Sequence, residues 1–258
     1  MDPASRQTFV LYSGDLNDSY DYWNWYGCFF NPNTINASWL NRNTITIATQ
    51  GNHDGANTDA SKFNDFFPLS NTDEITSGGG YYSLNYGPVH LVVIDPYGNE
   101  DWSDEGGHPN PGEPQWTWLE NDLQVANDDP DIKFIACIYH TAAYSMGGHA
   151  DNVVMQNACD QLFETYGVDL CLSGHNHYYA RALVDDIYHM TLGSGGATQG
   201  ASYLGADHPL VTVYAEGTFF TKFTVTGDEL KAEVYEHTGD GEVSSSLVDS
   251  FTINALDN

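Results

Sequence analysis

The chain has 258 residues, 41% of them hydrophobic, which is enough for one sizeable core. Its 7 basic and 36 acidic residues give a formal net charge of -29, which argues against nucleic acid or an anionic membrane as a partner. The electrostatic field of this negative charge also repels a phosphate ester, unless bound cations make the binding site locally positive. An acidic surface suits an extracellular or salty medium, so we expect an extracellular or cell-envelope location.

The length favours one domain over residues 1–258. The sequence contains no run of 18 apolar residues and no charged-then-apolar leader, so no membrane insertion is expected. The oligomeric state is open.

The four cysteines have no Cys-x-x-Cys spacing, so we expect buried thiols rather than a zinc knuckle. The sequence leaves the disulfide state of Cys28 and Cys159 open.

Four apolar stretches in chain order are predicted to be strands that end in metal-ligand side chains. The carboxyl ends of the strands of an α/β sheet lie along one edge, where such side chains can form a site. The four stretches are Phe9 to Tyr12 before Ser13-Gly14-Asp15, Thr44 to Ala48 before Gly51-Asn52-His53-Asp54, Ile132 to Ile138 before Tyr139-His140, and Val168 to Leu172 before Ser173-Gly174-His175-Asn176-His177.

Other segments carry ordinary signals of local structure. An aromatic segment from Tyr20 to Tyr26 either walls a pocket or shields a strand end. The remaining predicted elements are a hairpin of Tyr81 to Tyr86 and Val89 to Asp95, helices over Gln115 to Ala126 and Val153 to Tyr166, a strand over Ile187 to Leu192, and a hairpin across Thr226-Gly227-Asp228.

The ligand-type side chains define a hypothesis for a metal centre. An aspartate, an asparagine and two imidazoles, at Asp15, Asn52, His140 and His175, form an oxygen and nitrogen shell suited to Zn, Fe or Mn. His177 could serve a second cation, with Asp15 bridging the two. Two such cations can hold a phosphate ester and generate hydroxide from bound water. The alternative is that the histidines are surface residues in turns.

Ester hydrolysis also requires a proton donor for the leaving oxygen. His53 lies next to a candidate ligand without being needed as one, so it is the candidate general acid, and Asp54 is expected to orient its ring. The alternative for His53 is an exposed loop histidine with no such role.

In this order, the blocks resemble the calcineurin-like metallophosphoesterases. Further segments resemble the purple-acid-phosphatase-like branch of that superfamily: Gln115 to Leu119, Val168 to Arg181, Gly193 to Ala197, and Val248 to Phe251. The resemblance implies an α/β (α+β) fold in which two mixed β-sheets pack as a sandwich with flanking helices. It also implies that this chain lacks the first strand of that fold.

The resemblance assigns a role to each candidate residue. Asp15 would bridge two metals, His53 would be the catalytic histidine, and His149 and Arg181 would bind substrate. His149 could also be an ordinary loop residue beside Gly147-Gly148. The remaining metal ligands implied by the resemblance are Asn52, His140 and His175 at one metal and His177 at the other.

The sequence departs from the family pattern in two places. No Asp-x-His or Asp-x-Gly block precedes Asp15, so a missing upstream segment is expected, and only Asp15 and His177 remain for the second metal. Asp18 stands where the branch has a tyrosine. We therefore expect either a metal-dependent phosphoric-ester hydrolase acting on a small substrate, or a non-catalytic acidic extracellular binding module. A nuclease is disfavoured by the charge.

Overall fold

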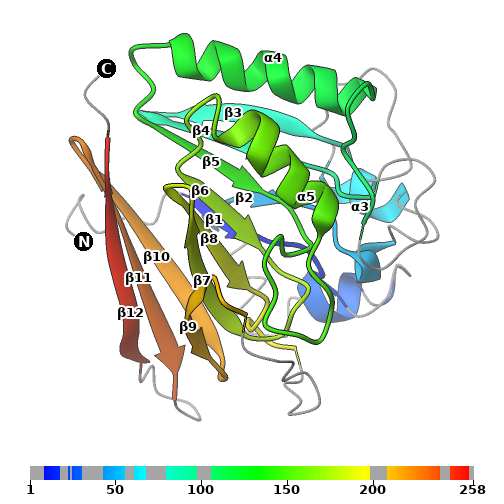
Figure 1. Cartoon of the computed structure of the whole chain (residues 1–258). Coiled ribbons are helices and arrows are strands. Elements are labelled where there is room, and N and C mark those ends of the chain that lie inside the picture. Colours follow the sequence, from blue (N-terminus) through cyan, green and yellow to red (C-terminus); the bar gives the residue numbers. More distant parts are fainter. Residues whose placement is uncertain are drawn as a thin grey trace.

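The computed structural model describes residues 9–17, 23, 25–30, 43–55, 61–67, 80–97, 106–197, 208–238 and 245–255 (Figure 1). Its centre is a seven-stranded mixed sheet in the order β3-β4-β5-β6-β8-β7-β9. These strands are β3 (Tyr82–Tyr86), β4 (Val89–Val93), β5 (Phe134–Ile138), β6 (Leu170–Ser173), β7 (Tyr179–Val184), β8 (Ile187–Leu192) and β9 (Val211–Ala215).

A second layer of strands packs on one face of this sheet. Alternate residues of the central strands, such as Leu91 and Val93, point toward it and form one core with Phe219, Leu230 and Val234. The second layer consists of the parallel pair β1 (Phe9–Tyr12) and β2 (Ile45–Ala48) and the antiparallel trio β10 (Phe219–Thr226), β11 (Glu229–His237) and β12 (Ser245–Asn254).

Helices cover the opposite face of the central sheet (Figure 1). The helix α4 (Pro114–Asp128) has a proline in its first turn and buries Leu119 and Leu123 completely, as its spacing predicts. Burial of each leucine contributes roughly 1.5–3 kcal/mol. The helix α5 (Val153–Ala158) continues into the short π-helix η4 (Cys159–Phe163). None of the helices in the described ranges combines the length and the apolar character that a membrane span requires.

The mixed α/β sandwich confirms the predicted fold class, with one difference in the second layer. Two mixed sheets are expected from the sequence, whereas hydrogen bonds join the described second-layer strands only within the pair β1-β2 and within the trio β10-β11-β12. Each group instead packs against the central sheet through its own apolar side chains, among them Ile47 and Ile253.

Within the described part of the aromatic segment, Trp25 shields a strand end, whereas Trp23 and Tyr26 are exposed. Trp25, in the short π-helix η2 (Trp25–Phe29), is completely buried and shares a core with Ala48, the last residue of β2. Phe63 and Phe67, in and just after α3 (Ser61–Phe66), complete that cluster. Tyr20 and Tyr22 lie outside the described residues.

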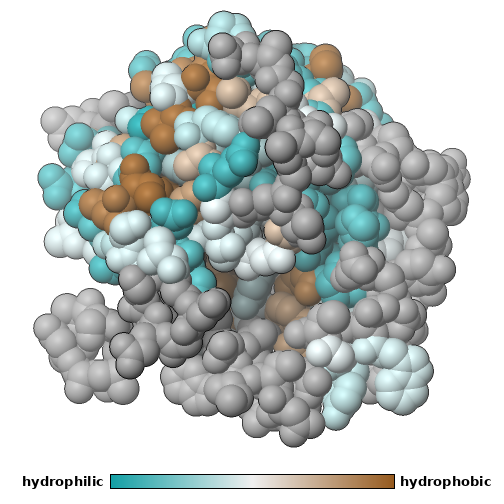
Figure 2. Space-filling model, turned by 90° about the horizontal axis from the view of Figure 1, so that it is seen from below, coloured by the Kyte–Doolittle hydropathy of each residue, from teal (hydrophilic) through white to brown (hydrophobic). Residues whose placement is uncertain are grey.

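Parallel neighbours in the central sheet end at the same edge. β4, β5, β6 and β8 are all parallel to one another, with Val93 opposite Ile138 and Ile138 opposite Leu172. The segments after β5 and β6 therefore leave the sheet side by side, and the backbone N–H of Gly174 donates to the carbonyl of His140 at 2.7 Å. Seen from below, hydrophilic residues border a hollow in the surface (Figure 2).

Candidate metal centre

The segments that follow β1, β2 and β5 converge on the side chain of His140. Its Nδ1 lies 2.7 Å from the carbonyl oxygen of Ser13, just after β1. Its Nε2 lies 3.2 Å from Oδ2 of Asp15 and 3.1 Å from Oδ1 of Asn52, which is in the short helix η3 (Asn52–Asp54) after β2. The carbonyl contact fixes which ring nitrogen faces the two oxygen donors.

Glycines allow these segments to approach so closely. A Cβ on Gly51 would collide with the backbone and carboxylate of Asp15, and one on Gly14 would collide with the ring of His140. A Cβ on Gly174 would lie 2.6 Å from the carbonyl oxygen of Ser13. The glycines of three of the four predicted blocks are therefore required by packing around one centre.

Two of the candidate ligands have a backbone conformation that costs free energy. Asp15 and His175 have φ values of 54° and 65°, in the left-handed region that few residues other than glycine adopt. Such conformations persist where the surroundings impose them, and they concentrate at functional sites. Here they turn both side chains toward His140, whose ring centroid lies 5.0 Å from that of His175.

Asp15 and His140 stabilise each other's charged form. Burial alone would raise the pKa of Asp15, but the His140 imidazole and the backbone N–H of His53, which donates to Oδ1 at 2.9 Å, hold it well below its usual range. Burial alone would lower the pKa of His140, but the Asp15 carboxylate raises it above its usual value. The centre therefore contains an anionic oxygen donor.

His175 supplies a neutral nitrogen donor. Burial, followed by the charge of His140, lowers its pKa to about 2, so the imidazole is uncharged at physiological pH. Its Nε2 is buried and has no hydrogen-bond partner within the described ranges. Donor atoms of Asp15, His140 and His175 all lie within 4.8 Å of one another. An orphaned nitrogen beside a carboxylate and a second imidazole is a donor set that fits a transition metal ion.

The other two expected ligands differ in position. Asn52 is half-buried and its Oδ1 is next to His140, so it fits the same centre. His177 is half-buried and lies outside the group of three donors. The structure thus assembles the ligands expected for one cation and leaves His177 at its margin.

The side chain of His53 is exposed to solvent and follows the candidate ligand Asn52 in the chain. Exposure is what a group that contacts a substrate arriving from solution requires. Asp54 makes contacts that its position next to His53 in the sequence does not indicate. Its completely buried carboxylate accepts from the backbone N–H groups of Gly51 and Leu16, each at 3.0 Å, and from Nδ2 of Asn17 at 3.3 Å. Asp54 therefore joins the loop after β2 to the loop after β1. Its expected role in orienting the His53 ring stays a prediction.

His149 lies at the centre, although it is nine residues beyond His140. Its ring centroid lies 3.6 Å from that of His175. The loop that carries it is held by Asn176, whose Nδ2 donates to the carbonyl of Gly147 at 2.9 Å and to Oγ of Ser145 at 2.7 Å. The hydroxyl of Tyr178 accepts from the backbone N–H of Met146. The residues that hold this loop, Ser145, Asn176 and Tyr178, have no role that the sequence alone indicates.

Arg181 faces the second layer of strands, unlike the other candidate substrate-binding residue. Its Nε donates to Oδ2 of Asp249 on β12 at 2.7 Å, and its guanidinium lies 5.1 Å from the ring centroid of Phe251. Tyr179, two residues earlier on the same face of β7, also donates to Asp249. All these contacts join the central sheet to β12, and the expected contact between Arg181 and substrate stays a prediction.

The spatial arrangement agrees with a family comparison. A family model described as calcineurin-like phosphoesterase matches residues 2–179. The chain belongs to the calcineurin-like phosphoesterase family. All the candidate metal ligands lie inside the matched region.

Curated members similar to this phosphoesterase chain include purple acid phosphatases. Probable purple acid phosphatase 20 of Arabidopsis thaliana is 24% identical over 92% of this chain and 56% of its own length. Purple acid phosphatase 1 of Ipomoea batatas is 24% identical over 84% of this chain and 50% of its own length. The chain thus spans about half the length of these relatives.

Solved structures share the phosphoesterase fold. A purple acid phosphatase from yellow lupin superposes with a TM-score of 0.62 and 19% identity over 95% of this chain and 46% of its own. GAP50 of Plasmodium, described as the anchor in the inner membrane complex, superposes with a TM-score of 0.70 and 16% identity over 97% of this chain and 79% of its own.

Proposed function

We propose that this chain is a metal-dependent phosphoric-ester hydrolase with His53 as the proton donor. The observation that supports it best is the convergence of Asp15, His140 and His175 within 4.8 Å, with the Nε2 of His175 lacking a partner among described residues. Family membership favours the same reaction class.

The donor set suits transition cations, which we propose to be two, drawn from Zn, Fe and Mn. Asp15, Asn52, His140 and His175 would hold one, and Asp15 and His177 would contribute to the other. One curated relative is named an Fe(3+)-Zn(2+) purple acid phosphatase. When bound, such cations polarise phosphoryl oxygens and lower the pKa of water. They also offset the charge of -29 that repels an anionic ester.

His53 and His149 act on the substrate in this proposal. The exposed His53 ring holds a proton for the leaving oxygen of the ester, while its backbone N–H holds Asp15 in place. His149, fixed against His175, orients the phosphoryl group. Asp54 keeps the loops that carry Asp15 and His53 in register.

Hydrolysis of two monoesters tests the role of His53. An alkyl leaving group needs a proton more than an aryl leaving group does, since the alkoxide is the stronger base. His53→Ala should therefore lower kcat by about 10²–10⁴-fold for an alkyl phosphate and by less for an aryl phosphate, with unchanged metal content. An aryl phosphodiester, assayed in parallel, reports the ester preference.

The matched control is His237→Ala, which removes another exposed histidine, at the end of β11. It should leave both rates unchanged. Equal losses for the two esters in His53→Ala would mean that His53 does not supply the proton. Full activity of that variant with both esters would remove it from the mechanism.

A second candidate function is a non-catalytic acidic binding module that keeps the fold. The position of His177 favours this candidate. Among the described residues, one group of three donors forms around Asp15, and His177 is not a member of it. The fold likeness to GAP50, an anchor protein by its description, is compatible with it. Stoichiometric metal binding without hydrolysis of any phosphate ester would support this candidate over the first.

We further propose that residues 1–258 form one domain, since β1 and β2 pack on the same core as β10 to β12. An extracellular or cell-envelope location is proposed from the acidity alone. Secretion of a tagged full-length gene product would test it.

A further inference from the structure

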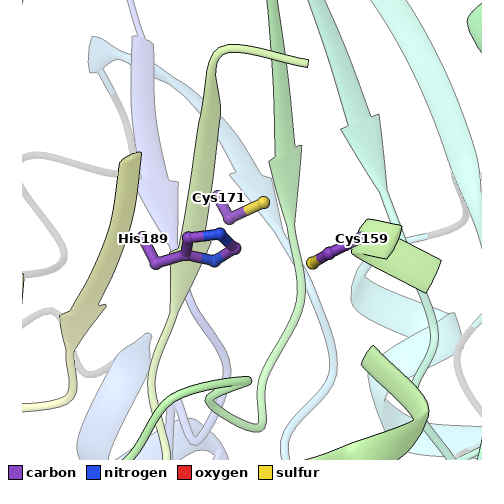
Figure 3. Close-up of side chains that lie close together, drawn as sticks. All are labelled: Cys159, Cys171 and His189. Atoms are coloured by element: carbon purple, nitrogen blue, oxygen red, sulfur yellow. The ribbon is translucent and has the colours of Figure 1, made fainter. Parts of the chain in front are cut away.

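A second cluster of metal-ligand side chains lies on the helix-covered face of the central sheet. Cys171 on β6 and His189 on β8 are direct neighbours across the parallel strand pair. Cys159, at the start of η4, points at them from the helical layer (Figure 3). The site is thus built from three separate elements, independently of the centre around Asp15.

The three donors are close together and buried. The sulfur atoms of Cys159 and Cys171 and a ring nitrogen of His189 all lie within 4.8 Å of one another. The exposed fractions of the three residues are 3%, 1% and 7%.

His189 has no polar partner to explain its burial. Neither Nδ1 nor Nε2 accepts or donates a hydrogen bond within the described part of the chain. Leaving a buried polar group unsatisfied costs about 1–3 kcal/mol, and this ring has two such nitrogens. An unpartnered imidazole nitrogen among two sulfur atoms is a candidate metal ligand. The ring of Tyr144 contacts the His189 ring edge to face, with the centroids 4.7 Å apart.

We propose that Cys159, Cys171 and His189 bind a thiophilic divalent cation of the zinc type. Thiolate and imidazole are the ligands such a cation prefers. Binding requires each thiol to release its proton to solvent, so two protons leave as two metal–sulfur bonds and one metal–nitrogen bond form. Two thiolates then balance the two positive charges, and the neutral unit avoids the penalty of a buried net charge.

The sheet provides a matched control cysteine. Cys137 on β5 is directly opposite Cys171 on the other side and is equally buried, but it is not a member of the group of three donors. An alanine at position 137, 159 or 171 removes one sulfur from the same apolar core in each case. The three variants should therefore lose similar amounts of packing and differ in metal binding.

Cobalt(II) separates this site from the Asp15 centre, because only sulfur ligands give an intense thiolate-to-metal charge-transfer band in the near ultraviolet. The full chain, reduced and stripped with a chelator, should develop this band on titration with Co²⁺ and lose it on addition of Zn²⁺. Cys159→Ala and Cys171→Ala should abolish the band, and Cys137→Ala should keep it. His140→Ala, which damages the other centre, should also keep it.

Zinc content gives a second measurement. Each of Cys159→Ala and Cys171→Ala should bind one equivalent less zinc than Cys137→Ala, with circular dichroism used to select folded variants. Absence of the band in the reduced wild-type chain would overturn the proposal, as would a band of equal intensity in all three cysteine variants. If the reduced chain binds no cobalt there and oxidation joins Cys159 to Cys171, the pair is a disulfide and the metal site is refuted.

Discussion

The imidazole of His149 lies against that of His175, with ring centroids 3.6 Å apart and planes inclined by 36°. Nine residues separate His149 from His140, and the intervening chain turns back through Gly147 and Gly148, whose φ values of 107° and 91° suit glycine alone. The contact places a histidine at the metal centre without making it a member of the donor group.

His149→Ala should therefore reduce turnover without releasing metal. A hydrogen bond to a charged group contributes about 1.5–3 kcal/mol, which corresponds to a loss of roughly 10- to 100-fold in kcat/KM for a phosphate ester. Metal analysis of the purified variant should match the wild type. A loss of bound metal in this variant would mean that His149 supports the ligands rather than the substrate.

Gly51→Ala should disrupt the candidate metal centre by displacing the backbone of the loop after β2. The added methyl group has no room beside Asp15, so the loop after β2 must move away and carry Asn52 with it. We expect a loss of stoichiometric metal at this centre and a stability decrease of about 1–3 kcal/mol, measured by metal analysis and denaturant unfolding. Gly195→Ala is the control, because a Cβ there meets nothing within 4 Å. Normal metal binding by Gly51→Ala would contradict the close packing.

The sequence predicts the strands and their functional ends because those signals are local. Apolar runs followed by a ligand residue define β1, β2, β5 and β6. The blocks after β1, β2 and β6 also contain a glycine, and each of these glycines is explained by contacts at the centre. Helical spacing predicts α4 to within two residues at its C-terminal end. These features can be predicted without knowing which residues far away in the sequence will contact them.

Long-range contacts determine the partners of Asp54, whereas the strand β7 lies beside a local turn. Asp54 is adjacent to His53 in the chain, but its partners Leu16 and Asn17 lie 38 and 37 residues away. β7 was not predicted as a strand, although the turn Asp185-Asp186 before Ile187, with both φ values positive, is typical of a two-residue hairpin. That turn is a signal from which the β7-β8 hairpin could be predicted.

Asp54→Asn distinguishes between the two roles considered for that residue. An amide keeps one oxygen but directs an NH₂ group at a backbone N–H, so one buried hydrogen bond is lost. If Asp54 joins the two loops, the variant should lose about 1–3 kcal/mol of stability and bind metal more weakly. Unchanged stability and metal affinity, with only kcat and its pH profile altered, would instead support the role of orienting His53.

Asp249→Asn should reduce stability in a way that depends on pH. The side chains of Arg181 and Asp249 are only 16% and 10% exposed, and the pair connects β7 to β12. Burial alone would raise the pKa of Asp249, but the hydrogen bonds from Arg181 and Tyr179 hold it below its usual value. The unfolded chain therefore binds a proton more readily than the native chain, and the pair stabilises the fold above the ordinary aspartate pKa of about 4.

The stabilisation by this pair is complete at neutral pH and is lost as the pH falls through the native pKa. We expect Asp249→Asn to cost about 2 kcal/mol at pH 7, and we expect the difference from wild type to shrink as the pH falls below about 4. Urea unfolding at several pH values measures both. Asp131→Asn is the control, since it removes the same charge from an exposed position of this acidic chain. A cost for Asp249→Asn that is equal at all pH values would show that packing, rather than the ion pair, joins the two sheets.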